Sequence, residues 1–124
     1  MPFAFESLTV YKVALDWITQ ATLIASSLKH TGLAPLADQL IRASTSISLN
    51  IAEGNGRWHK GDKKQYFWIA RGSIFECVAI IQATMQQDGV SKDCYSKAYA
   101  TLESLSKMLT KLIQSIDSLR TTEP

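Results

Sequence analysis

The sequence predicts an all-α protein, an antiparallel up-down-up-down four-helix bundle, on three observations. Apolar residues recur at three- and four-residue steps through four long segments, without the strict alternation of half-buried strands. Glycine and proline mark the breaks between these segments. The connections are short, which favours antiparallel neighbours. We therefore expect one domain over residues 1–124, with helices at about 5–28, 35–54, 62–87 and 91–119.

The first two helices are predicted from apolar stripes and from the residues that end them. Thr31 and Gly32 should stop the first helix, Pro35 should open the second, and Gly54 and Gly56 should end it. Small serine and threonine residues at 44–48 would let a neighbouring helix approach closely. The stripes comprise Val10, Ala14, Trp17, Ile18, Ala21, Ile24, Ala25 and Leu28, and then Leu36, Leu40, Ala43, Ile47 and Ile51.

The last two helices carry capping signals as well as stripes. Asp62 should cap the third helix, with Gln65 three residues later as in a capping box, and Asp88-Gly89 should end it. Ser91 should cap the fourth helix, whose apolar residues form a heptad seam. The stripes are Phe67, Ala70, Ile74, Cys77, Val78, Ile81 and Met85, and then Ala98, Leu102, Leu105, Leu109, Leu112, Ile116 and Leu119. Met85, Met108 and Trp17 are predicted to be core, and the tail 120–124 to be frayed.

Composition indicates a globular, cytoplasmic protein. Apolar residues make up 46% and charged residues 19% of the chain, and the net charge is only +2. The N-terminus lacks the basic and apolar regions of a signal peptide, and no apolar run is long enough for a membrane span. Cys77 and Cys94 lie in different predicted helices, which favours buried thiols in a reducing compartment; a disulfide is the alternative.

Enzyme chemistry is not expected. His30 and His59 are the only histidines, and neither has the spacing to Glu, Asp or Cys that a metal site requires. No serine lies in a nucleophile elbow near a histidine. The segment 54–57 has glycines like a phosphate loop but follows a helix and lacks the Gly-Lys-Ser/Thr ending. We therefore predict no catalytic residue, no metal and no cofactor.

A basic segment between the second and third helices is the strongest functional signal. The candidate nucleic-acid-binding residues are Arg57, His59, Lys60, Lys63 and Lys64. Trp58, Tyr66 and Trp68 lie among these cations, as aromatic rings do where single-stranded nucleic acid stacks. The alternative is a solvated loop and a charged helix face, with the aromatic rings in the core or in subunit contacts.

A second group of polar residues is predicted to form a structural network between the second and third helices: Arg42, Asn50, Glu53, Arg71 and Glu76. An Arg–carboxylate pair would satisfy charges that are costly to bury. Glu53 is expected to be buried against Arg71, with Arg42 as the second choice of partner. Setting the register of the bundle or of its subunits is favoured over a ligand site.

Three segments carry a family resemblance: Phe5-Glu6-Ser7-Leu8-Thr9-Val10-Tyr11, the stretch 40–57 with Asn50-Ile51-Ala52-Glu53-Gly54, and the stretch 66–77 with Ile69-Ala70-Arg71-Gly72-Ser73. Together they resemble the 23S rRNA-intervening sequence proteins, also called the four helix bundle protein family. The resemblance implies a bacterial four-helix bundle that forms a homopentamer. The family is also similar to the accessory variability determinant of diversity-generating retroelements, a pentameric bundle that binds nucleic acid and a reverse transcriptase.

Two functions follow as hypotheses. The first is a homo-oligomer that binds RNA, DNA or a nucleoprotein partner, such as a reverse-transcriptase-like protein, through its basic rim. The second is a protein-binding adaptor without nucleic-acid activity; an enzyme with a site between subunits is a distant third. The surplus of large aromatic residues beyond the four stripes predicts self-association, and no membrane partner is expected.

Overall fold

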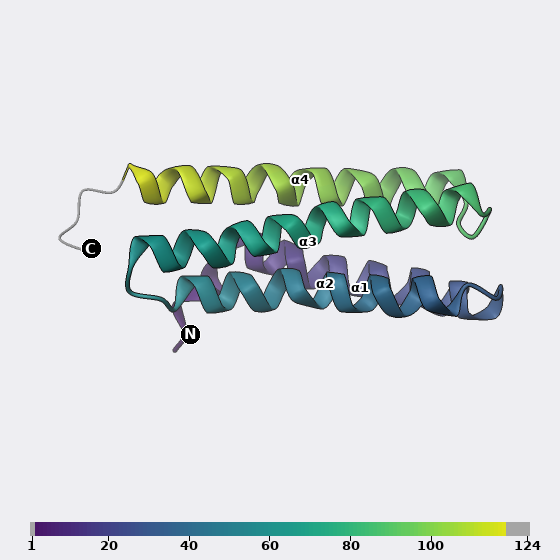
Figure 1. Ribbon diagram of the computed structural model, residues 1–124, viewed down its shortest axis with the longest axis horizontal. Helices are drawn as coiled ribbons and strands as arrows, with labels where there is room; N and C mark the ends of the chain where they lie inside the picture. Colours follow the sequence, from purple (N-terminus) through teal and green to yellow (C-terminus); the bar gives the residue numbers. More distant parts are fainter. Residues whose placement is uncertain (1, 119–124) are drawn as a thin grey trace.

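Four long helices, preceded by a short 3₁₀ helix, make up a computed structural model that describes residues 2–118. The elements are η1 (Ala4–Ser7), α1 (Thr9–His30), α2 (Ala34–Asn55), α3 (Lys60–Gln86) and α4 (Lys92–Asp117). Successive helices run antiparallel, and their connections lie at alternate ends of the molecule (Figure 1). The predicted all-α four-helix bundle is confirmed, and no strand occurs within residues 2–118.

The first helix begins later than predicted. Its start was placed at Phe5, but residues Ala4–Ser7 form a separate 3₁₀ turn, and α1 starts at Thr9. Leu8 separates the two because its backbone is extended, with φ −71° and ψ 127°. The other end agrees with the prediction, since Gly32 adopts a left-handed φ of 81° that most residues avoid.

The predicted end of the second helix is one residue early, and the predicted N-cap of the third helix is wrong. Gly54 lies inside α2 and is buried, and the helix continues to Asn55, with Gly56 as its C-cap. Asp62 lies in the first turn of α3, whose N-cap is His59. The predicted cap at Ser91 is confirmed, since its Oγ accepts a 3.1 Å hydrogen bond from the Cys94 N–H. Asp88, with φ 56°, follows the end of α3 as expected.

The core is one continuous apolar cluster along the bundle, and it contains most of the predicted stripe residues. Trp17, Phe67 and Leu105 are among its completely covered side chains. Six predicted core residues are only half-buried: Ile18, Leu36, Val78, Met85, Met108 and Leu112. Leu119 lies outside the described residues.

The seam of α4 departs from the heptad near its end. Ile113 is buried where Leu112 was expected. The α-helix has 3.6 residues per turn, and a straight helix drifts away from a strict 3.5-residue repeat. One position of the seam therefore differs, and the seam is again as predicted at Ile116. Within residues 2–118, no helix is both long enough and apolar enough to cross a membrane.

Candidate functional site

The connection between α2 and α3 gathers the predicted basic residues at one end of the bundle. We call this the basic end and define it by Arg57, His59, Lys60, Lys63 and Lys64. The end of α4 and the start of α1 lie at the same end of the molecule (Figure 1). Trp58 lies among these cations and is 66% exposed, so its ring is available for contact.

Arg57 is held by two partners within the chain. Its Nη2 donates to Glu53 Oε1 at 2.8 Å and to the Tyr66 hydroxyl at 2.7 Å. The guanidinium also lies over the Tyr66 ring, 4.7 Å from the centroid. The hydrogen bond that Arg57 donates to the Glu53 carboxylate raises the pKa of Arg57 above its ordinary value. Arg57 therefore ties the C-terminal turn of α2 to the first turns of α3.

Two lysines of the basic end are also engaged. Lys63 Nζ donates to the Asn55 carbonyl at 2.9 Å, which satisfies one of the free carbonyls at the end of α2. Lys64 Nζ donates to Asp117 Oδ1 at 2.7 Å and so joins α3 to α4. An ammonium group has three donors, so each lysine retains N–H groups beyond the bond described.

The predicted network between α2 and α3 does not form as expected. Glu53 pairs with Arg57 on its own helix and its side chain is 54% exposed. Arg42 and Glu76 are exposed, and Asn50 Nδ2 donates to the Ser46 carbonyl at 2.8 Å. Glu53 was expected to be buried against Arg71. That pairing is wrong, because Glu53 lies on the outer surface of α2.

Arg71 has a different environment from the one predicted. Its Nε donates to Thr110 Oγ1 on α4 at 3.2 Å. The guanidinium lies over two aromatic rings, 4.5 Å from the centroid of Phe75 and 5.4 Å from that of Trp68. Sequence reasoning missed this arrangement, although the spacing of three and four residues around Arg71 places both rings beside it on a helix.

A substitution at Glu53 tests this correction. Glu53→Ala is expected to leave the denaturation midpoint nearly unchanged, because the Glu53–Arg57 pair is exposed and surface ion pairs contribute little. Chemical denaturation of the variant and parent at equal protein concentration measures the effect. A large destabilisation would show that Glu53 is buried in the folded protein.

The middle of the bundle contains a buried polar line that the sequence analysis did not identify. Trp17 Nε1 donates to Ser44 Oγ at 2.8 Å, and Ser44 Oγ lies 3.5 Å from Cys77 Sγ. Burial raises the pKa of the Cys77 thiol to about 11. Cys77 therefore stays protonated at neutral pH and is a poor nucleophile. The line joins α1, α2 and α3 and is structural.

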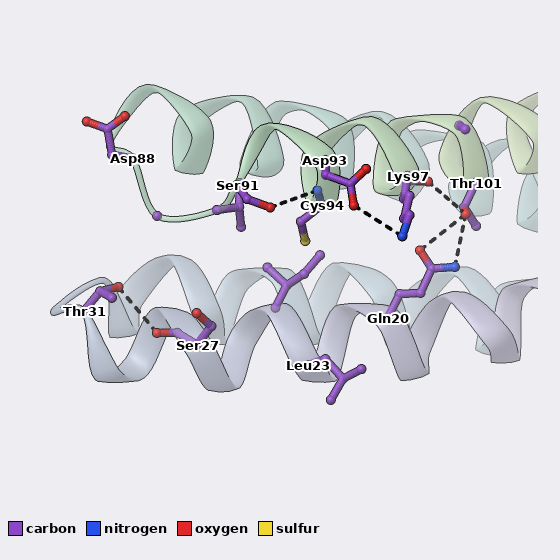
Figure 2. Close-up of a pocket in the computed structure, with 14 residues that line it drawn as sticks. Gln20, Leu23, Ser27, Thr31, Asp88, Ser91, Asp93, Cys94, Lys97 and Thr101 are labelled. Carbon is purple, nitrogen blue, oxygen red and sulfur yellow. Dashed lines mark hydrogen bonds and ion pairs between the residues drawn. The ribbon is translucent and has the colours of Figure 1, made fainter.

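The helices α1 and α4 leave a groove of about 1040 Å³ between them, towards the end opposite the basic end. Figure 2 shows Gln20 and Thr101 meeting across it, with a 3.1 Å bond from Gln20 Nε2 to Thr101 Oγ1. Lys97 and Asp93 pair along α4 at 3.3 Å, and the half-buried Cys94 lines the groove. The groove presents hydroxyl, amide and thiol groups without a histidine.

The two histidines and the acidic and thiol groups are spread over the described part of the chain. His30 ends α1 and His59 precedes α3, so the two histidines lie at opposite ends of the bundle (Figure 1). Across residues 2–118, no three His, Cys, Asp or Glu side chains come together in a way that could hold a metal ion.

Comparison with known proteins identifies the family. A search of curated proteins gives no match. Among solved structures, the fold is similar to the crystal structure of a protein with unknown function from the S23 ribosomal protein family of Bacteroides thetaiotaomicron, with a TM-score of 0.82 and 18% identity. The match covers 86% of this chain and 99% of that chain. The model of the 23S rRNA-intervening sequence proteins matches residues 6–111, and the chain therefore belongs to this family.

Proposed function

We propose that this protein is a non-enzymatic homo-oligomer that binds nucleic acid, or a nucleoprotein partner, through its basic end. The family resemblance implies five subunits. The observation that carries the proposal is the exposed Trp58 ring among five basic side chains at one end of the bundle. Cations contact phosphates and aromatic rings stack on bases, which together suit a single strand without sequence preference.

Assembly strengthens such a surface. The whole chain carries a net charge of only +2, so one basic end is a weak site. A ring that displays several copies of the basic end on one side raises the effective concentration of phosphate partners and therefore the avidity. A weak patch on each subunit can then bind a long strand.

The salt dependence of binding tests the proposal. Labelled single-stranded RNA and duplex DNA are titrated at two salt concentrations with the parent and with a Lys60→Gln, Lys63→Gln, Lys64→Gln triple variant. Each lost phosphate contact should reduce the slope of log affinity against log salt by about 0.7 for single strands and about 0.9 for duplex DNA. Circular dichroism checks the fold, because Lys63 and Lys64 also make bonds within the chain.

A matched control removes the same charge from the opposite end. Lys29→Gln, Lys92→Gln, Lys97→Gln changes three exposed lysines near the α1–α2 and α3–α4 connections. This variant should bind like the parent. If the parent binds neither nucleic acid at low salt, or if both triple variants bind as the parent does, the nucleic-acid function is excluded.

A protein-binding adaptor is the second candidate, and one observation favours it. Arg57, Lys63 and Lys64 already make bonds that hold the end of the bundle together. If these residues serve only to hold the helices together, the basic end is structural. The exposed apolar side chains would then bind the partner protein. The adaptor predicts no binding of RNA or DNA at low salt by the unmodified protein.

A further inference from the structure

Helix α3 carries large exposed apolar side chains on the side that faces α4. Trp68 is 51% exposed, Phe75 52%, and Tyr99 of α4 is 41% exposed. Arg71 lies on the first two rings and bonds to Thr110 of α4. A groove of about 390 Å³ between α3 and α4 is lined by Phe75 and Tyr99. We call Trp68, Arg71, Phe75 and Tyr99 the aromatic face.

The opposite flank of α3, towards α2, carries a second exposed apolar group. Ser73 donates to Ser46 of α2 at 2.9 Å, which identifies this flank. Ile69 and Glu76 lie four residues before and three residues after Ser73, and helical spacing places them on the same side. Leu49 follows Ser46 by three residues. Leu49 is 63% exposed, Ile69 is 44% exposed and Glu76 is exposed. We call Leu49, Ile69 and Glu76 the aliphatic face.

The two faces lie at the same level along the bundle and adjoin at α3. Gly54 packs against Phe67, and Ser46 bonds to Ser73, so Leu49 lies opposite the turns of α3 between those two positions. Trp68, Arg71 and Phe75 occupy the same turns. Figure 1 shows α3 between α2 and α4, so one helix contributes to both faces.

Gly72 lies on α3 between the two faces and leaves the helix backbone uncovered there. Gly72 is exposed in the middle of α3, and a Cβ added to it would meet nothing within 4 Å. Glycine in a helix interior costs about 1 kcal/mol relative to alanine, and packing within the chain does not require it here. A helix backbone without a side chain at this position lets a neighbouring surface come close, between the two faces.

The charges of the two faces are complementary. The cation of the aromatic face, Arg71, bonds to a neutral hydroxyl and forms no ion pair with a carboxylate in the described part of the chain. The aliphatic face carries Glu76, which likewise forms no ion pair among residues 2–118. The two faces therefore fit one another in apolar character and in charge, at matching levels.

We propose that the aromatic face of one copy packs against the aliphatic face of a second copy, with Arg71 near Glu76 of the neighbouring copy. Such a head-to-tail contact uses two different faces, so it continues from copy to copy and closes into a ring when the rotation fits. Because the two faces adjoin at one helix, each added copy is rotated relative to the one before it, and the assembly curves. Faces on opposite sides of the bundle would instead give a straight row of copies. This interface rests on the self-assembly in the proposed function.

A mixing experiment tests the interface. Phe75→Glu disables the aromatic face and Leu49→Glu disables the aliphatic face, so each variant alone should have the 13.7 kDa mass of one chain by light scattering. When the two variants are mixed, the intact aliphatic face of Phe75→Glu can pack against the intact aromatic face of Leu49→Glu. The mixture should form a one-to-one dimer with twice the mass of either variant.

Two further variants separate the possible outcomes. Leu23→Glu replaces a 70% exposed leucine of α1 outside both faces and should assemble as the parent does. Exchanging the charges by Arg71→Glu with Glu76→Arg should restore the assembly that Glu76→Arg alone weakens, and circular dichroism checks that all variants fold. A monomeric parent at micromolar concentration overturns both the self-assembly and this interface. An assembling parent whose Phe75→Glu and Leu49→Glu variants also assemble, or whose two variants stay monomeric when mixed, overturns the interface alone.

Discussion

Replacing Trp17 with alanine is expected to lower the free energy of unfolding by about 3–5 kcal/mol. Trp17 has 0% of its surface exposed and is one of the largest completely covered side chains. Its removal leaves a cavity between α1 and its neighbours and also leaves Ser44 without the 2.8 Å bond from the indole N–H. Native domains are stable by only about 5–15 kcal/mol, so the variant should be close to unfolding at room temperature.

A Trp17→Phe variant separates the loss of buried area from the loss of the hydrogen bond to Ser44. Trp17→Phe keeps much of the buried area but removes the donor to Ser44, and the loss should be about 1–3 kcal/mol. Denaturant titrations followed by circular dichroism measure both variants, at equal protein concentration because self-association would also contribute to stability. An alanine variant with the parental midpoint would show that Trp17 is not buried in the core.

Replacing Gly54 with alanine is expected to destabilise the protein by about 1–3 kcal/mol, as overpacking of a tight core does. An added Cβ would lie 2.8 Å from Phe67 Cε1 and 3.0 Å from Tyr66 Cβ. Phe67 is 1% exposed, so its ring has no free space to move into. Helix propensity alone would make Gly54→Ala stabilising, because alanine favours a helix over glycine by about 1 kcal/mol. A loss of stability therefore reports the close contact with α3.

Gly61→Ala is the matched control. Gly61 lies in the first turn of α3, and an added Cβ would meet nothing within 4 Å. The substitution should be neutral or should stabilise the protein by up to about 1 kcal/mol. Thermal or chemical denaturation of both variants gives the comparison. Stabilisation by Gly54→Ala would contradict the close contact between α2 and α3.

The helices themselves could be predicted because their signals are local. Apolar residues at three- and four-residue steps place the stripes, and Gly32 and Ser91 act through their own backbone geometry and hydrogen bonds. These features depend on neighbours within one turn. The start of α1 was less predictable, because the extended backbone at Leu8 separates two helical segments that share one apolar pattern.

The basic end was predicted as a group of cations, but its internal bonds were not. Lys64 contacts Asp117, fifty-three positions later in the chain, and this contact exists only because α3 and α4 lie side by side. Likewise, Arg71 faces α4 and Glu53 faces outward, although both were predicted to belong to one network between the second and third helices. The rotation of each helix about its own axis decides such partners, and no local pattern specifies it.

The sequence by itself determined the fold class, the four helices and most of the core, because hydrophobic periodicity and capping are properties of consecutive residues. Only the tertiary structure decided that Gly54 is a packing position, that Arg71 lies on two aromatic rings, and that α3 carries exposed apolar side chains on two flanks. These features depend on which sides of neighbouring helices meet. The helix rotations that are adopted leave few voids and few unpaired polar groups in the bundle as a whole, which no single helix determines.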